Sequence, residues 1–422
     1  MSIECKREEI GSGIAYTEII DKRLKTNMFM ISFCEQASFE TAAANAVIPM
    51  ILSDSSAEYP TITKLSRHLA SLYGASVRAG NIKLGDYHIL TASASCIADR
   101  YTIDGENIND VLTDTFIGCV FDPNIADGVF EKNDFELKKN ELTDEIDAEI
   151  NDKRSYAFRK ASEIIFENEP AAVPANGRRR EADKLTSEEA YRRYRKILET
   201  ARIEFMFIGS EISEVNKKKL FDALLSVDRK SSVECSRKLS PAKHETVCFT
   251  EKMDIAQSKT IMAFKTGYDN YPAMIVFNAI FGSTPFSKLF LNVREKMGLC
   301  YYCTSSFNDK KGTLFVDIGT AHSNTDAARA EIINQLENMK KGDFSDEDIV
   351  NAKLSCINGL KSVKDSPTAL AMWYLRKILF DGLVSPEEEI QKINAVTRDR
   401  IISAAESLVL DTVYILSGKE DN

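Results

Sequence analysis

Residues 282–302 read GSTPFSKLFLNVREKMGLCYY, and they are the most informative stretch of the chain. Apolar side chains recur here at the spacing of one helical face, namely Leu289, Phe290 and Val293. The pattern predicts a helix over residues 287–296, which Gly298 is suited to end. Two strand-like runs follow, at 299–307 and 313–318, with a polar turn between them. The stretch therefore predicts a helix that leads directly into a β-hairpin.

Arg294 and Tyr301 are the two side chains of this stretch with the clearest chemical potential. Arg294 lies near the end of the predicted helix and Tyr301 in the first predicted strand, so the turn between them allows both side chains to face one cleft. A guanidinium and a phenol both donate hydrogen bonds, and such a pair can bind a peptide carbonyl or an oxyanion. The alternative is an ordinary helix and hairpin whose arginine forms a surface ion pair.

Three short motifs carry a family resemblance, and they are Ser287-Lys288-Leu289-Phe290, Arg294-Glu295-Lys296 and Gly298-Leu299-Cys300-Tyr301. In this order and spacing they resemble the C-terminal domain of the pitrilysin-like zinc peptidases, in particular the bacterial processing-peptidase branch. Residues 257–318 carry the specific part of the resemblance, and the rest of the chain resembles the family in length and element order. The resemblance implies that Arg294 and Tyr301 hold the backbone of a peptide substrate opposite a zinc ion.

The zinc motif of that family, His-x-x-Glu-His on an N-terminal helix, is absent from this sequence. The histidines are His68, His88, His244 and His322, and no two of them have the spacing of the motif. At the expected place lies an apolar helix over residues 43–52, and the resemblance puts the former ligand positions near Asn45, Ile48, Pro49 and Met50. None of these residues offers an imidazole, a thiolate or a carboxylate. We expect a degenerate site whose helix fills its own cleft with core.

In active members a glutamate on a later helix is the third zinc ligand, and Glu145 in the acidic segment 135–146 is the residue that resembles it. Lys138 stands where the family usually has a supporting glutamate. A single glutamate on a charged helix is typical of a solvent-exposed face. Because Glu145 has no histidines to work with, we expect no cofactor in this chain and zinc only in a partner subunit.

Length and composition exclude several classes of protein. A chain of 422 residues suits two domains of roughly 200 residues each, and a formal net charge of −10 argues against a nucleic-acid surface. No apolar run is long enough to span a membrane, and the first residues lack the apolar stretch of a signal peptide. Nine irregularly spaced cysteines suit a reducing compartment better than a disulfide framework. We expect a cytoplasmic protein with no nucleic-acid or membrane partner.

The two halves of the sequence have a similar order of elements. A helix followed by a hairpin recurs around Gly74 and Gly298, further helices follow, and each half ends in an apolar strand. This order predicts an α+β fold of two similar domains, each a mostly antiparallel β-sheet with helices packed on one face. The resemblance implies the fold of the mitochondrial processing peptidase-like metallohydrolases. A polar linker is predicted at 227–241, between an N-terminal peptidase-like domain at 1–226 and a C-terminal one at 242–422.

Cys300 and Cys303 have the Cys-x-x-Cys spacing of redox and metal motifs. One such pair cannot complete a zinc site of four ligands. In a regular strand, side chains three residues apart point to opposite faces of the sheet. The sequence therefore predicts two separate thiols.

Two classes of function follow from these observations. The favoured hypothesis is a non-catalytic, substrate-binding subunit of a heterodimeric zinc peptidase, which is not an enzyme on its own. It contributes Arg294 and Tyr301 to the peptide-cleaving chamber of a paralogous partner that carries His-x-x-Glu-His. The alternative is a peptide-binding or scaffold homodimer with no peptidase role.

Overall fold

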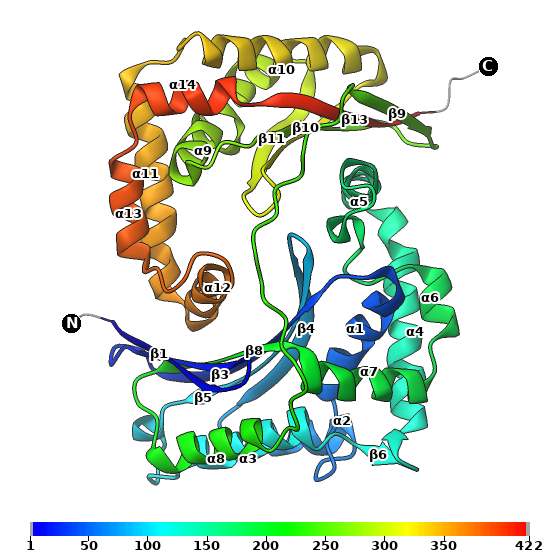
Figure 1. Ribbon diagram of the computed structural model, residues 1–422, viewed down its shortest axis with the longest axis vertical. Helices are drawn as coiled ribbons and strands as arrows, with labels where there is room; N and C mark the ends of the chain where they lie inside the picture. Colours follow the sequence, from blue (N-terminus) through cyan, green and yellow to red (C-terminus); the bar gives the residue numbers. More distant parts are fainter. Residues whose placement is uncertain (1–2, 419–422) are drawn as a thin grey trace. The chain divides into compact units, whose positions relative to one another are not determined.

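The computed structural model describes residues 3–418, and these form two compact units (Figure 1). Each unit combines three separate segments of the chain. Within the described residues, unit 1 consists of 3–148, 173–236 and 364–383, and unit 2 consists of 149–172, 237–363 and 384–418. The passage from unit 1 to unit 2 at residues 236 and 237 lies inside the segment that the sequence predicts as a linker.

Unit 1 is built on a six-stranded sheet in which β2 and β8 run parallel and the other neighbours run antiparallel. In order across the sheet, the strands are β1 (Glu4–Gly11), β2 (Ile14–Ile20), β8 (Arg202–Gly209), β3 (Thr26–Gln36), β5 (Tyr87–Ile97) and β4 (Ser76–Leu84). A separate ribbon pairs β6 (Ile125–Ala126) with β7 (Val129–Phe130). Side chains alternate along a strand, so Phe29, Ile31 and Phe33 of β3 all enter the same hydrophobic core.

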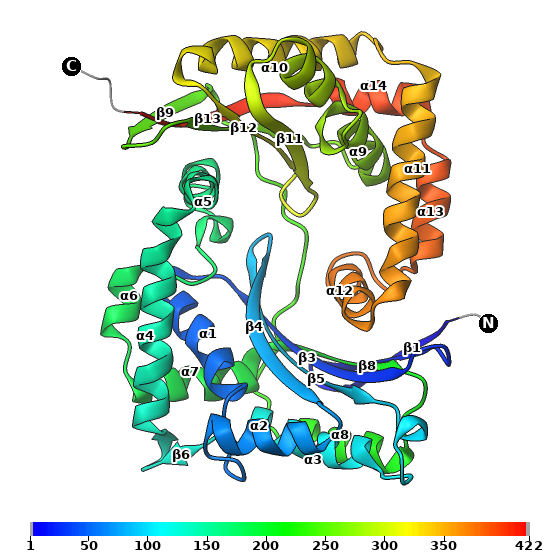
Figure 2. The same cartoon turned by 180° about the vertical axis from the view of Figure 1, so that it is seen from behind.

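The helices that share this core lie along the same face of the sheet. They are α1 (Phe39–Leu52), α2 (Ile62–Ser71), α3 (Ile108–Phe121), α4 (Lys132–Ala148), α6 (Arg179–Lys184), α7 (Ser187–Thr200) and α8 (Glu214–Leu225), with a 3₁₀ turn at Asp99–Tyr101. Figures 1 and 2 show α3 and α8 side by side along the sheet. Local signals set several of their boundaries: Thr186 and Glu189, for example, form a capping box at the start of α7.

Unit 2 is built on a five-stranded sheet in which β13 and β9 run parallel and the other neighbours run antiparallel. In order, its strands are β11 (Cys300–Asn308), β12 (Thr313–Thr320), β10 (Ser258–Lys265), β13 (Val409–Ser417) and β9 (Val247–Lys252). Helices packed on one face are α9 (Tyr271–Asn278), α10 (Thr325–Lys340), α11 (Asp346–Ser362), α13 (Pro386–Asn394), α14 (Arg398–Glu406) and the π-helical turns η4 (Ala279–Ser283) and η5 (Leu289–Lys296). Short 3₁₀ turns occur at Glu149–Asn151, Pro170–Ala172, His322–Asn324 and Val363–Asp365.

Helix α12 (Pro367–Ile378) belongs to unit 1, although it comes from the second half of the sequence. It packs on β3 and β8, and Thr368 Oγ1 lies 3.8 Å from Met28 Sδ. Met28 points away from the face that carries Phe29, so α12 covers the second face of the sheet. In Figure 1 its orange ribbon lies against the blue strands.

Helix α5 (Lys153–Ile165) occupies the corresponding place in unit 2, although it comes from the first half of the sequence. The ring of Phe158 on α5 lies 4.9 Å from that of Phe315 on β12, and Phe166 just beyond α5 packs on the same ring. The neighbours of Phe315 in β12, Leu314 and Val316, point into the other core. Each unit thus includes one helix from the opposite half of the sequence. The predicted domain 1–226 does not contain α12, and the predicted domain 242–422 does not contain α5.

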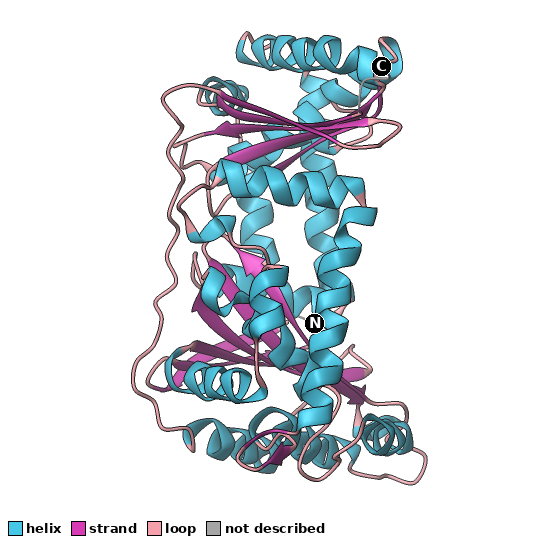
Figure 3. Ribbon diagram, turned by 90° about the vertical axis from the view of Figure 1, so that its right-hand side faces the viewer, coloured by secondary structure: helices cyan, strands magenta, loops and turns pink. Residues whose placement is uncertain are grey.

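The predicted fold class is confirmed, because both units are α+β layers with mixed sheets that carry helices (Figure 3). The exchanged helices α5 and α12 add a covering to the second face of each sheet. Among residues 3–418, no helix is both long enough and apolar enough to cross a membrane.

Candidate functional site

Helix α1 corresponds to the helix on which the resemblance places the lost zinc ligands. It begins directly after β3, where Ser38 Oγ accepts a hydrogen bond of 3.2 Å from the backbone N–H of Glu40. Asn45, Ile48 and Pro49 are buried and Met50 is partly buried. The predicted degenerate positions therefore lie within the core of unit 1.

The first of these positions, Asn45, is bound by an arginine from a distant part of the sequence. Asn45 Oδ1 accepts a hydrogen bond of 2.9 Å from Nε of Arg193 on α7, and the same guanidinium donates to Glu35 on β3 at 3.2 Å. The Nδ2 atom of Asn45 has no partner among the described residues. A fixed, largely buried positive charge beside Asn45 opposes the binding of a divalent cation.

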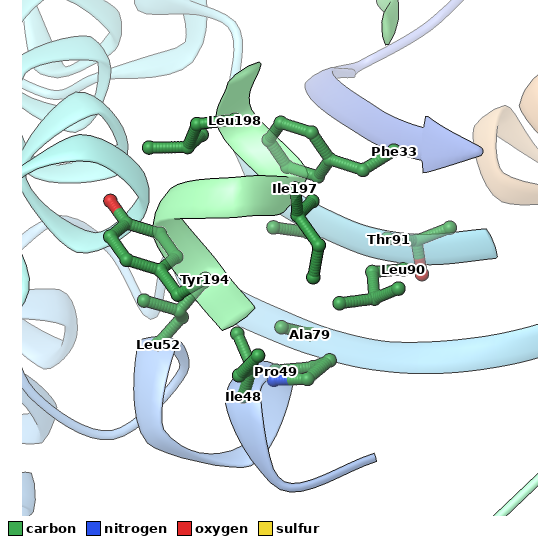
Figure 4. A pocket seen from close by; sticks show the side chains of 11 residues that line it. Phe33, Ile48, Pro49, Leu52, Ala79, Leu90, Thr91, Tyr194, Ile197 and Leu198 are labelled. Carbon is green, nitrogen blue, oxygen red and sulfur yellow. The ribbon is translucent and has the colours of Figure 1, made fainter. Parts of the chain in front are cut away.

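Ile48 and Pro49 turn toward the sheet and α7, as Figure 4 shows. Only about 10 Å³ of free space remains among these side chains, which is roughly the room of a single water molecule. The lining of this space is almost wholly apolar and consists of Phe33, Ile48, Pro49, Leu52, Ala79, Leu90, Thr91, Ala92, Tyr194, Ile197 and Leu198. Pro49 also has no N–H to donate to the Asn45 carbonyl one turn earlier. Apolar side chains thus occupy nearly all the space between this helix, the sheet and α7.

Glu145 on α4 is exposed, and its carboxylate accepts a hydrogen bond of 3.3 Å from Asn176 Nδ2. Lys138, seven residues earlier on the same helix, forms ion pairs with Asp54 at 2.5 Å and Glu141 at 2.8 Å. Partial burial disfavours the charged amine, but the hydrogen bonds with the two carboxylates outweigh it and raise the pKa of Lys138. Lys138 therefore keeps its positive charge at the position of the family's supporting glutamate.

The side chains at the former site do not fit a zinc ion. Zinc in proteins takes imidazole, thiolate or carboxylate ligands, whereas these positions hold an amide, two apolar side chains and a thioether. Across residues 3–418, no three histidine, cysteine, aspartate or glutamate side chains gather in a way that would hold a metal ion.

Gly177 allows the loop after Asn176 to pack directly on α1, and its replacement gives a testable result. Gly177 has φ +72°, and a Cβ there would lie 2.7 Å from the backbone nitrogen of Ala43. We expect Gly177→Ala to lower the free energy of unfolding by about 2 kcal/mol or more, measured by urea denaturation. Gly128→Ala is the matched control, because Gly128 has φ +81° but open space around its Cβ position. Equal losses in the two variants would show that the contact with α1 contributes nothing beyond backbone strain.

The predicted helix of the opening stretch is present in unit 2 as the π-helical segment η5, one or two residues shorter than expected. Gly298 ends it in the left-handed region, at φ +60°, and donates a hydrogen bond of 3.1 Å to the carbonyl of Arg294. The Arg294 side chain is 41% exposed, its guanidinium lies over the Phe290 ring at 4.7 Å, and Nε is 3.6 Å from Glu295. Exposed ion pairs of this kind hold little energy, so the guanidinium remains available to a ligand.

Tyr301 is placed by a β-bulge at the start of β11. Cys300 pairs with Thr320 on β12 and Tyr302 pairs with the adjacent Gly319, so Tyr301 is an extra residue without a partner in the ladder. The residue is 58% exposed. Bulges commonly redirect a side chain out of a sheet, and this one presents the phenol of Tyr301 to solvent.

The same bulge overturns the prediction that Cys300 and Cys303 face opposite sides of the sheet. One inserted residue shifts the alternation, so both side chains now point toward the core of unit 2. Cys303 is part of that core and Cys300 packs against its edge, and each thiol shifts the pKa of the other. No local signal in the sequence distinguishes this bulge from a regular strand, so the residues alone do not predict that the two thiols share a face.

The structure thus divides the predicted site residues between the two units. Arg294 on η5 and Tyr301 at the start of β11 both belong to unit 2, and both are substantially exposed. The degenerate positions and Glu145 belong to unit 1, where Glu145 is exposed and the positions on α1 are closed by core packing. The arrangement in unit 2 can donate hydrogen bonds to a peptide, whereas the arrangement on α1 offers no ligand set for metal-assisted hydrolysis.

Comparisons with known proteins agree with this geometry. The profile of the family "Peptidase M16 inactive domain" matches residues 184–356. The "Probable inactive metalloprotease YmfF" of Bacillus subtilis is 26% identical over 412 residues, which is 97% of this chain and 96% of that protein. A conserved protein from Enterococcus faecalis has the same fold with a TM-score of 0.88 and 27% identity, covering 99% of each chain. A peptidase M16 inactive domain from Pseudomonas fluorescens has a TM-score of 0.78 and 14% identity, also over 99% of each chain.

The fold is that of M16-like peptidase structures, and the helix that resembles their metal-binding helix is packed into core. Residues 184–356 thus match the inactive domain of the M16 peptidase family, and over nearly its whole length the chain is a homologue of a probable inactive metalloprotease.

Proposed function

We propose that this chain is the non-catalytic, substrate-binding subunit of a two-subunit zinc peptidase. Arg294 and Tyr301 donate hydrogen bonds to the backbone of a peptide, while a paralogous partner supplies the metal and the His-x-x-Glu-His motif. The chain has no zinc of its own in this proposal, and its substrate is a peptide.

One observation carries the proposal: the positions on α1 that resemble the family's metal ligands are buried or partly buried in this chain, whereas the positions that resemble its substrate-binding pair are exposed. On α1, Ile48 and Pro49 are packed into core and Arg193 holds Asn45. On η5 and β11, Arg294 and Tyr301 stay exposed, and a bulge and a left-handed glycine support their positions. The exposed guanidinium and the exposed phenol do not belong to the core of unit 2, which suits a ligand-binding role.

The role of the pair is tested by Arg294→Ala in the complex with an active paralogue from the same genome. A hydrogen bond from a charged group contributes about 1.5–3 kcal/mol, so we expect kcat/KM for a peptide to fall about tenfold or more, with the complex intact. Tyr301→Phe removes one neutral hydrogen bond and should have a smaller effect in the same direction. Lys296→Ala, which removes another cation of η5, is the control. Unchanged turnover in Arg294→Ala, or an equal loss in Lys296→Ala, would rule out a specific grip on the peptide.

The alternative, a scaffold homodimer, is separated by assembly and metal content. Co-expression with the paralogue should yield a heterodimer that contains one zinc ion per pair, measured by light scattering and elemental analysis. A zinc-free homodimer that ignores the paralogue would support the scaffold instead. Zinc bound by this chain alone would contradict both.

A further inference from the structure

The two thiols at the start of β11 form a pair whose members differ in exposure. Cys303 is 5% exposed and lies within the core of unit 2, whereas Cys300 is partly exposed at the edge of that core. The bulge at Tyr301 brings them to the same face of the sheet, where both contact the core of unit 2. An accessible thiol backed by a buried one is the arrangement of a reactive cysteine and its resolving partner.

The surroundings of Cys300 favour its thiolate. The hydrogen bond from Cys303 lowers the pKa of Cys300, partial burial opposes this, and the positive charge of Arg294 lowers the pKa further. The same hydrogen bond and deeper burial raise the pKa of Cys303, which keeps its proton. The charge and the hydrogen bond thus act on one sulfur of the pair, and it is the accessible one.

Within residues 3–418, no positive charge lowers the pKa of Cys34, Cys96 or Cys119. Burial raises the pKa of Cys96 and Cys119 to about 12, and each of these thiols is fully buried in unit 1. The Sγ atoms of Cys34 and Cys235 lie 2.8 Å apart and also pair a buried thiol with a partly exposed one. However, the hydrogen bond with Cys235 and burial raise the pKa of Cys34, and the nearby carboxylates of Glu35 and Glu204 help to raise it further. Cys248 on β9 is exposed. It therefore reports the reactivity of an ordinary accessible thiol.

We propose that Cys300 and Cys303 are a hydroperoxide-sensitive dithiol that closes reversibly into a disulfide within β11. In the first step the Cys300 thiolate attacks one peroxide oxygen, an S–O bond forms, the O–O bond breaks, and the leaving alkoxide or hydroxide takes up a proton. Cys300 is thereby oxidised to a sulfenic acid and the peroxide is reduced to an alcohol or water. In the second step the Cys303 sulfur attacks Cys300, the S–S bond forms, the S–O bond breaks, and the hydroxide leaves as water with the Cys303 proton. A small-molecule thiol reverses the reaction by thiol–disulfide exchange.

This modification site does not depend on the proposed peptide role, although it adjoins it. Tyr301 lies between the two cysteines, and Arg294 acts on Cys300. A disulfide across the bulge would tie both ends of the loop that presents Tyr301. The dithiol proposal is tested by thiol oxidation and the peptide-binding proposal by peptidase turnover, so either can be refuted without the other.

The test treats the full chain with hydrogen peroxide, blocks remaining thiols by alkylation after denaturation, and maps tryptic peptides by mass spectrometry. The peptide of residues 297–310 contains both cysteines. We expect the mass of this peptide to fall by two hydrogens and its cysteines to escape alkylation. This change should be several-fold faster than the oxidation of Cys248, and dithiothreitol should fully restore alkylation of both cysteines. In Cys303→Ser, Cys300 should instead accumulate as a sulfenic acid that dimedone traps. In Cys300→Ser, neither product should form.

Two further outcomes decide the mechanism. Arg294→Gln keeps the shape of the side chain but removes its charge, so it should slow oxidation of Cys300 several-fold without affecting Cys248. If residues 297–310 remain doubly alkylated while Cys248 is oxidised, or if Cys300 in Cys303→Ser reacts no faster than Cys248, the proposal is overturned. A disulfide that links Cys300 to another cysteine would overturn it as well.

Discussion

Residues 1–236 expressed alone are expected to form no stable domain, although they contain every strand of the six-stranded sheet. Without residues 364–383 the second face of that sheet loses α12 and exposes Met28, Met30 and Met206, each at most 5% exposed in the full chain. Each buried methionine contributes about 1.5–3 kcal/mol, so their sum is comparable with the whole stability of a domain. The truncated chain should bind 8-anilinonaphthalene sulfonate and unfold without a cooperative transition.

The control for this result restores the missing helix. Fusing residues 364–383 to the end of 1–236 through a flexible linker should recover cooperative unfolding and reduce dye binding. A fusion with Leu370 and Leu375 changed to serine, two buried positions of α12, should not. Cooperative unfolding of the truncated chain without α12 would show that the helix exchange is dispensable.

A Lys265→Met variant is expected to be more stable than the natural chain at neutral pH. Lys265 on β10 is 2% exposed, and its Nζ lies 4.2 Å from the centre of the Phe166 ring without a hydrogen-bond partner among the described residues. Burial lowers its pKa to about 8, with smaller opposing contributions from Asp411 and Glu169. Methionine fills a similar volume without a charge, so the free energy of unfolding at pH 7 should rise by about 2 kcal/mol.

The dependence of this gain on pH follows from the direction of the shift. Between about pH 8 and 10.4 the unfolded chain holds the Lys265 proton and the folded chain has lost it, so the natural protein becomes more stable as pH rises. The advantage of Lys265→Met should therefore be constant below pH 8 and fade toward pH 10.4, measured by urea denaturation. Lys341→Met at an exposed position should show neither effect. A pH-independent advantage would mean that packing rather than the buried charge limits stability.

The sequence predicts those features that depend on neighbouring residues. Helical spacing and Gly298 are local signals, and the helix–hairpin they predict is present at η5, β11 and β12. The degenerate site is equally local, since its positions share one helix and a ligand is defined by residue type. A polar stretch without apolar period predicts a linker at 227–241, and the boundary between the two units at residues 236 and 237 falls inside it.

Long-range contacts decide the remaining features. Arg193 reaches Asn45 across 148 residues, and no pattern near either residue indicates that contact. The faces of Cys300 and Cys303 depend on a bulge, which arises from the register with β12 and not from the residues of β11 alone. The exchange of α5 and α12 is also invisible in sequence, because an amphipathic helix shows that it needs an apolar partner but not which sheet supplies it.

The sequence by itself thus determined that this protein lacks the His-x-x-Glu-His motif, because the motif is a local spacing and no two of the four histidines have it. Only the tertiary structure decided which of the predicted site residues are buried and which are exposed. Packing placed Ile48 and Pro49 in core, and strand register exposed Tyr301 beside a pair of thiols. These outcomes depend on which distant surfaces meet, and that information is distributed over the whole chain.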